Sequence, residues 1–353
     1  METIGKKRIL KQRAILGLML VAIAVWAVSL PYTVYTPYEP INIIGLDDIV
    51  FSQNIPSNTQ YSGRTRLKPL SAEYINRLLT FDYIISRIFL VDPETILFPS
   101  DINVQEFLQA DLTINTYQQG YQILVFHTHS AEMFVDSNPD YPMTGIMGVG
   151  EYLTQILNQV YGIPTKHYKG RFDVIEGRAH RQGSYERMEP VIRQILKDNP
   201  SIQVVIDLHR DGVGDHVPPF VQYIDGTRTA QIMFFNGLSR RNRGGVAEAV
   251  QWLPNPYQTE NLNFSFRMQL AANQLYPGLM RRVYLRAFRY SLHMLPLSTL
   301  VEVGNQHNTQ QDALYAMHPL ANIITAVILG YDTMPMEEEE QHGISAYTFI
   351  GSR

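Results

Sequence analysis

The sequence predicts an α/β fold in which a mixed, mainly parallel β-sheet is covered by helices on both faces. Short, largely apolar runs recur at 122–126 (QILVF), 202–208 (IQVVIDL), 230–235 (AQIMFF) and 298–304 (STLVEVG). Such runs are typical of strands buried in the middle of a sheet. Longer segments with helical spacing of apolar residues alternate with these runs. This alternation favours a sheet with helices packed on its two faces.

The predicted helices follow one another along the chain. One or two short helices are expected at 71–90 behind a capping Ser71, because apolar residues there recur at helical spacing. DPETILFPSDI and VQEFLQADL then indicate loops and a short helix. Further helices are predicted at Val149–Tyr161, at 184–199 behind a capping Ser184, at 260–276 and at 316–331.

Composition and charge exclude several classes of protein. The chain has 353 residues, 45% of them hydrophobic and 18% charged, so it can bury a core and is not a disordered chain. It contains no cysteine, which excludes disulfides, thiolate zinc sites and cysteine nucleophiles. Residues 1–13 hold five basic groups and one acidic group. The rest therefore carries 24 basic and 32 acidic groups, a net −8, and no nucleic acid is expected as a partner.

The N-terminal segment predicts where the protein resides. Residues 14–30 (AILGLMLVAIAVWAVSL) carry no charge, and no charge follows before Glu39. We predict a transmembrane anchor at 14–34 behind a basic cytoplasmic tail at 1–13, because basic residues stay on the cytoplasmic side. The alternative is a cleaved signal peptide, although the apolar stretch is longer than a usual signal core. Both hypotheses place the rest of the chain outside the cytoplasm, and the first makes it a single-pass protein of the cell membrane.

The remaining chain is divided by composition. Residues 35–68 are rich in Pro, Asn, Ser, Thr and Tyr and are predicted to form a linker. A segment of helices and loops is expected at 69–118, followed by the main α/β domain at 119–332. Residues 333–353 contain four consecutive glutamates and are predicted to form an acidic flexible tail.

Side chains capable of metal chemistry follow three predicted strands. The candidates are His127, His129 and Glu132 after the first strand, His209, Arg210 and Asp211 after the second, and Glu302 in the last. Ligands of α/β sheets bind beyond the carboxyl ends of strands, so we expect these residues to meet. Imidazole and carboxylate suit Zn²⁺, and a hydrolytic zinc keeps three protein ligands and a water. Since a carboxylate in a buried strand is costly unless paired or metal-bound, Glu302 is the sharpest signal.

Plainer interpretations of the same residues stay open. A His-x-His pair is often a hydrogen-bonding pair, and His209 after an apolar strand can be an ordinary buried histidine. No glycine-rich phosphate loop and no Gly-x-Ser-x-Gly elbow is present, which disfavours nucleotide use and serine hydrolysis. The other histidines are expected in loops or on helices, mostly in structural or surface roles: His167, His180, His216, His293, His307 and His318.

Several segments, in this order, resemble the stage II sporulation protein P family. They are ILVFHTHSAEMF, GSYERMEPVIRQILKDNPSIQVVIDLHRDG, AQIMFF, YPGLMRRVYLR and LVEVGNQHNTQQDAL, within Tyr121 to Gly330. The resemblance implies a membrane-anchored peptidoglycan hydrolase whose catalytic domain is similar to zinc-dependent N-acetylmuramoyl-L-alanine amidases. Such enzymes cut the amide between the lactyl group of the glycan and the stem peptide, and an endopeptidase activity is also ascribed to the family. It implies stage II sporulation proteins D and M as partners during engulfment.

The resemblance also implies roles for individual residues. His129 and His209 match zinc ligands, and Glu302 matches the glutamate that activates water. The amidases place a middle ligand, a glutamate, where this chain has Pro142-Met143-Thr144, so Glu132 is taken as its substitute, with His127 as the competing ligand or orienting group. Arg210 and Asp211 are expected to hold the loop or the ligands. His293 matches a family histidine, but its neighbours are not retained, because the chain has Tyr290-Ser291-Leu292-His293 where Tyr-Asn-Gln-His is expected, so substrate contacts there are expected to differ.

Two other functions compete with a zinc amidase that uses Glu302 as its general base. A metal-dependent deacetylase of glycan N-acetyl groups would use similar ligands and release acetate. A membrane-tethered, catalytically idle wall-binding scaffold would need no metal. Metal and product analysis distinguish these three.

Overall fold

The computed structural model describes residues 67–332. The predicted basic tail, membrane anchor, acidic tail and nearly all of the predicted linker lie outside the described residues. Within 67–332, none of the helices combines the length and the apolar composition that a bilayer crossing requires.

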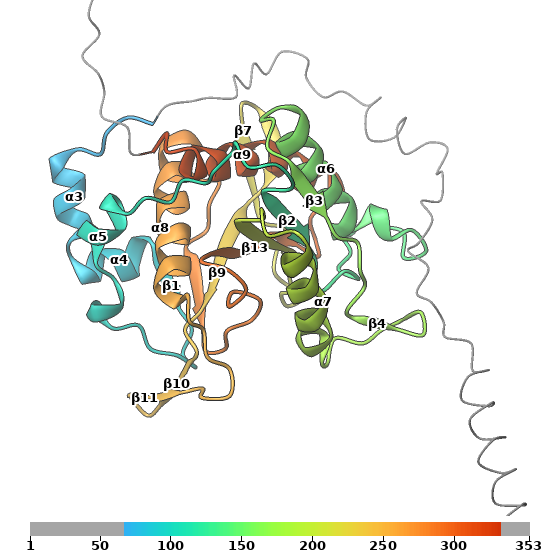
Figure 1. The fold of residues 1–353 in the computed structure, drawn as a ribbon, viewed down its shortest axis with the longest axis horizontal. Helices are drawn as coiled ribbons and strands as arrows, with labels where there is room; N and C mark the ends of the chain where they lie inside the picture. Colours follow the sequence, from blue (N-terminus) through green and yellow to red (C-terminus); the bar gives the residue numbers. More distant parts are fainter. Residues whose placement is uncertain (1–66, 333–353) are drawn as a thin grey trace, which may run out of the picture. The chain divides into compact units, whose positions relative to one another are not determined.

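A seven-stranded sheet forms the centre of the described region (Figure 1). Its strand order is β1-β12-β9-β13-β6-β2-β3. The bounds are β1 Phe89–Val91, β2 Ile123–Phe126, β3 Thr165–His167, β6 Val204–Asp211, β9 Ile232–Gly237, β12 Val283–Arg286 and β13 Leu297–Asn305. Among its neighbouring pairs, β9–β13 is antiparallel and the others are parallel. The prediction of a mixed, mainly parallel sheet is therefore confirmed.

The strand directions explain where a site can form. Because β9–β13 is the antiparallel pair, β2, β3, β6 and β13 run one way, and β1, β9 and β12 run the other way. The carboxyl ends of β2, β6 and β13 consequently meet at one edge of the sheet. Their residues are buried except for Asp211 at the end of β6 and for Leu297 and Glu302 of β13, in agreement with the apolar runs in the sequence.

Helices cover both faces of this sheet, as predicted. Helices α6 (Ile146–Gln159) and α8 (Gln258–Leu275) each pack against α9 (Gln310–Ile328) in one layer. Helix α7 (Ser184–Asp198) packs Met188 and Ile192 onto Leu124 and Val205 on the other face. In Figure 1, strands β9 and β13 lie between α8 and α7.

Shorter elements surround this framework. Between residue 67 and β2 lie three small helices: α3 (Ala72–Leu78), α4 (Phe81–Arg87) and α5 (Val104–Gln109). Hairpins are formed by β4 (Val174–Ile175) with β5 (Arg178–Ala179), β7 (Val221–Ile224) with β8 (Thr227–Ala230), and β10 (Arg240–Arg243) with β11 (Val246–Ala249). The β10–β11 hairpin projects away from the sheet in Figure 1. Short 3₁₀ turns lie at Pro99–Asp101 and Pro142–Thr144.

Two predicted helix starts have different outcomes. Ser71 caps α3 as expected, because its hydroxyl accepts a hydrogen bond from the Tyr74 backbone N–H at 3.2 Å. The prediction that Ser184 caps the next helix is wrong. Gly183 occupies that position with a left-handed backbone (φ 74°), which glycine adopts without steric cost, and Ser184 is the first helical residue. Its hydroxyl is left free to contact the site described below.

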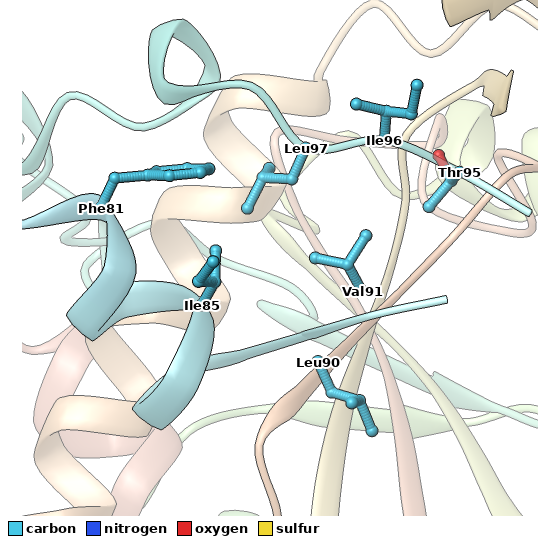
Figure 2. A pocket seen from close by; sticks show the side chains of 7 residues that line it. All are labelled: Phe81, Ile85, Leu90, Val91, Thr95, Ile96 and Leu97. Carbon is cyan, nitrogen blue, oxygen red and sulfur yellow. The ribbon is translucent and has the colours of Figure 1, made fainter. Parts of the chain in front are cut away.

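The segment 69–118 is joined to the sheet more closely than its helical pattern suggested. Phe89–Val91 forms the edge strand β1, which pairs in parallel with β12. A cavity of about 390 Å³ lies at this edge, lined by Phe81, Ile85, Leu90, Val91, Thr95, Ile96 and Leu97 (Figure 2). None of these side chains is titratable, and β1 is four strands away from β6. The cavity therefore offers no group for acid–base or metal chemistry.

Candidate active site

The three sequence segments with candidate ligands meet at the shared carboxyl edge of β2, β6 and β13. Phe126, the last residue of β2, lies opposite Asp207 of β6, and Glu302 of β13 lies opposite His209 of β6. Since side chains alternate along a strand, Asp207 and His209 point to the same face of the sheet, and Glu302 shares that face. The predicted convergence of these segments is therefore present in the fold.

His129, Glu132 and His209 form a compact group. One possible ligand atom from each lies within 4.8 Å of the other two. The two carboxylate oxygens of Glu132 divide between the histidines: Oε1 is 3.5 Å from Nδ1 of His129, and Oε2 is 3.5 Å from Nδ1 of His209. Glu132 and His209 are buried, while His129 remains partly accessible. Two imidazoles and a carboxylate thus face one small space that can be reached past His129.

Outer hydrogen bonds orient both imidazoles. His209 Nε2 lies 2.7 Å from Oδ1 of Asp207, and His129 Nε2 lies 3.1 Å from Oγ of Ser184. Because each Nε2 is held by its outer partner, each Nδ1 is directed toward Glu132. Partners of this kind fix the tautomer and ring orientation of metal-binding histidines.

The charges within the group are strongly coupled. Burial works against ionisation of Glu132 and Asp207, but the neighbouring His209 and their hydrogen bonds outweigh it and hold the pKa of both carboxyls below the usual range. Burial also works against a charged His209, and these two carboxylates outweigh it and raise its pKa well above the usual value. The metal-free group is therefore held together by a cationic imidazole between two carboxylates. A divalent ion would replace the proton on Nδ1 of His209, and the imidazole would remain as a ligand.

Glu132 is held by two further donors. The backbone N–H of Arg210 donates to Oε2 at 2.8 Å, and the Arg181 guanidinium donates to Oε1 at 3.1 Å. Arg210 thus supports Glu132 through its backbone, while its side chain donates to the carbonyl oxygen of Asp211 at 3.1 Å. The carboxylate of Asp211 pairs with Arg281 at 2.7 Å.

Glu302 differs from the other carboxylates of the site. Its Oε2 is buried and has no hydrogen-bond partner in the described protein. Burial, with the charges of Glu132 and Asp211, raises the pKa of Glu302 to about 8, although the nearby His209 works in the opposite direction. A partly buried carboxyl group with a pKa near neutrality and an unoccupied, buried acceptor oxygen is suited to accept a proton during a reaction.

Two other predicted residues lie outside the group. Both ring nitrogens of His127 are occupied, since Nδ1 contacts the Leu208 carbonyl at 2.7 Å and Nε2 contacts His167 Nε2 at 2.9 Å. His127 is therefore oriented away from the group of His129, Glu132 and His209. His293 contacts Glu189 of α7 at 3.2 Å and the Tyr290 carbonyl at 3.0 Å. The role of His127 as a ligand or orienting group and the family role implied for His293 stay predictions.

Sequence reasoning missed several residues that surround the group. Asp207 is fully buried and bonds His209, and Ser184 bonds His129. The ring of Tyr185 packs edge-on against the ring of His129, with 5.6 Å between the ring centroids. Asp207 had a detectable signal, because it is a carboxylate inside the apolar run IQVVIDL. Ser184 and Tyr185 had none, because their role depends on a residue more than 50 positions away.

The donor set fits a zinc ion on two structural grounds. It consists of two imidazoles whose Nδ1 atoms point toward one carboxylate, a combination that zinc accepts in hydrolytic sites. Beside it, Glu302 presents an unpartnered carboxylate oxygen, the group needed to handle a proton of water. His129, Glu132 and His209 are therefore the residues that would hold the ion.

The chain belongs to the stage II sporulation protein P family, whose model matches residues 88–325. Stage II sporulation protein P of Bacillus subtilis (strain 168) is 21% identical over 221 residues. That alignment covers 58% of this chain and 50% of the relative, so the chain spans about half the length of the curated relative it matches. The family predicted from the sequence motifs is thereby confirmed.

Solved structures similar to this one include three amidases. N-acetylmuramoyl-L-alanine amidase AmiC2 of Nostoc punctiforme is 17% identical, covers 61% of this chain and 98% of its own, and has a TM-score of 0.34. The CwlD amidase of Clostridioides difficile, in complex with the GerS lipoprotein, is 12% identical, covers 60% of this chain and 98% of its own, and has a TM-score of 0.37. The amidase Ami1 of Mycobacterium smegmatis is 15% identical, covers 63% of this chain and 99% of its own, and has a TM-score of 0.34. At such identities and TM-scores the likeness carries no conclusion about activity.

Proposed function

We propose that this protein is a zinc-dependent peptidoglycan hydrolase that cleaves the N-acetylmuramoyl-L-alanine amide bond. The observation that carries the proposal is the compact group of His129, Glu132 and His209 beside the unpartnered carboxylate of Glu302. Membership of the stage II sporulation protein P family supports peptidoglycan as the substrate and sporulation as the setting. We further propose a single-pass anchor at 14–34 with the catalytic domain outside the cytoplasm, and stage II sporulation proteins D and M as partners.

Each side chain of the group has one task in this mechanism. A zinc ion held by His129, Glu132 and His209 would supply Lewis acidity, lowering the pKa of water toward about 7. Glu302 takes a proton from the attacking water through its free oxygen and delivers it to the leaving amide nitrogen. Asp207 and Ser184 keep the two imidazoles oriented throughout. The products are a free carboxyl on the lactyl group and a free amine on the stem peptide.

The test uses the purified full-length chain, zinc quantification and mass analysis of products from isolated sacculi. Glu302→Gln is expected to lower peptide release by about 10²–10⁴-fold, the typical share of a general base, while the zinc content stays at the wild-type level. Glu248→Gln, an exposed carboxylate on the β10–β11 hairpin, serves as the matched control and is expected to retain activity. Wild-type rates from Glu302→Gln would contradict the assignment of Glu302.

The same products separate the competing functions. An amidase releases stem peptides that begin with a free L-alanine amine, and an endopeptidase leaves cut peptides on the glycan. A deacetylase releases acetate and no peptide. A scaffold binds no zinc and yields none of these products, and that result would contradict the whole proposal.

A further inference from the structure

A continuous chain of hydrogen bonds runs from the surface of helix α6 to the back of the candidate active site. Glu151 Oε2 lies 2.9 Å from Nδ1 of His167, and His167 Nε2 lies 2.9 Å from Nε2 of His127. His127 Nδ1 then reaches the carbonyl oxygen of Leu208 at 2.7 Å. The side chains of His167 and His127 are almost entirely buried, and that of Glu151 is 30% exposed.

We propose that Glu151, His167 and His127 are positioning residues that hold the Leu208 carbonyl, and with it the adjoining His209, through this chain of hydrogen bonds. The inference rests on the proposed function, because it assigns these residues to the support of a zinc ligand. His127 thereby has a role other than metal binding, since both of its ring nitrogens are occupied.

The contacts specify the direction of the two outer hydrogen bonds. A carbonyl oxygen only accepts, so Nδ1 of His127 must carry the proton donated to Leu208. The Glu151 carboxylate also only accepts, so Nδ1 of His167 carries a proton too. Between the two rings, one Nε2 donates and the other accepts. The three contacts therefore need three protons on the two imidazoles, and the Glu151 carboxylate at the end of the chain balances the positive charge.

The charges around Glu151 favour its hydrogen bond with His167. The hydrogen bond from His167 is the largest cause that lowers the pKa of Glu151 to about 2, and Lys169 Nζ lies 2.9 Å from the same oxygen. Burial outweighs the effect of Glu151 and leaves the pKa of His167 below its usual value. If both imidazoles were neutral, the lone pairs of the two Nε2 atoms would face each other at 2.9 Å.

Helix α6 contains a glycine where the chain of hydrogen bonds needs space. A Cβ atom on Gly150 would lie 2.5 Å from Nε2 of His127 and 3.1 Å from Nε2 of His167. Glycine inside a helix is less favourable than alanine, so its presence there needs a reason. The close approach of the two histidine rings accounts for a glycine at this position.

The connection to His209 is short and stiff. The Leu208 carbonyl belongs to the planar peptide group that joins Leu208 to His209. Holding this carbonyl therefore restricts the His209 backbone on one side, while Asp207 holds the His209 ring on the other. Misplacement of a reacting group by about 1 Å can cost on the order of 10²-fold in rate.

The test measures zinc binding and the His209 ring, neither of which requires turnover. His167→Phe and Glu151→Ala are expected to weaken zinc binding of the full-length chain by about 10–100-fold, the usual cost of losing an outer partner. Lys169→Ala is the matched control, because it removes an ion pair from Glu151 and leaves the chain of hydrogen bonds intact. In ¹⁵N-histidine-labelled metal-free protein, the first two variants are expected to lose the hydrogen-bonded ring N–H signals of His167 or His127 and to shift those of His209.

Separate outcomes address the two proposals. Unchanged His209 signals and zinc affinity in His167→Phe, with thermal unfolding showing a folded protein, would overturn the positioning role. If His167→Phe does not fold, Glu151→Ala gives the decision, since its side chain is partly exposed and its loss is less disruptive. If the signals shift as expected while the wild-type chain releases no stem peptide, the proposed function fails and the positioning role stands.

Discussion

Two carboxylates on neighbouring strands of the same sheet face have opposite surroundings. Asp207 of β6 is fully buried and accepts three hydrogen bonds, from His209 Nε2 at 2.7 Å and from the backbone and hydroxyl of Thr128 at 2.8 and 2.7 Å. Glu302 of β13 has a buried oxygen with no partner in the described protein. The pKa of Asp207 is lowered, and that of Glu302 is raised to about 8.

The difference separates a structural carboxylate from a reactive one. Asp207 keeps its negative charge because donors surround it, and it uses that charge to hold His209. The negative charge of Glu302 is energetically unfavourable unless a proton or a cation neutralises it. Buried polar groups without partners are rare in proteins, so this one calls for an explanation. Asp207 and Glu302 are both carboxylates on the same face of the sheet. They thus have different roles because only Asp207 has its hydrogen bonds satisfied.

The largest expected effect comes from removing Asp207. Asp207→Ala leaves the charged His209 and two Thr128 donors buried without an acceptor, and breaking such a buried pair typically costs about 3–5 kcal/mol. We expect the free energy of unfolding, measured by urea denaturation with a chelator present, to fall by that amount. Asp207→Asn keeps one acceptor and should lose less. Equal stabilities of the wild type and Asp207→Ala would contradict the structural role.

Replacing Glu302 is expected to stabilise the metal-free protein, whereas replacing Asp207 destabilises it. In the metal-free folded protein its pKa of about 8 lies above the ordinary 4.5, so its contribution to stability is full below pH 4.5 and is lost as the pH rises through 8. Glu302→Gln removes this loss. The melting temperature of the metal-free variant should therefore exceed that of the wild type by a margin that grows from pH 5 to pH 8.5. A margin that stays constant with pH would show that Glu302 ionises normally.

Burial and strand ends made part of this site predictable. Glu302 stood out because Val301 and Val303 flank it in an apolar run, and the same reasoning applies to Asp207 between Ile206 and Leu208. The carboxyl ends of buried strands then indicated which segments would meet. These inferences depend on local pattern and on one general rule of sheets, which is why sequence alone was sufficient.

The parts that escaped prediction depend on distant contacts. Strands β1 and β12 have three and four residues, too few for a periodicity signal, and they form because each pairs with a distant segment. Ser184 was expected to cap its own helix, yet its hydroxyl contacts His129, 55 residues earlier. His167 was expected to be structural or on the surface, and its contact with His127 depends on the pairing of β2 with β3.

The smallest expected effect comes from the hydroxyl that completes the partners of Asp207. Thr128→Val keeps the shape and the backbone hydrogen bond but removes the Oγ1 donor 2.7 Å from Oδ2. A hydrogen bond to a charged group contributes about 1.5–3 kcal/mol, so the free energy of unfolding should fall by up to that amount. Thr128→Ser retains the hydroxyl and should fall much less. If valine and serine variants unfold at the same urea concentration, the donors around Asp207 do not distinguish it from Glu302, and the contrast between the two carboxylates must come from burial alone.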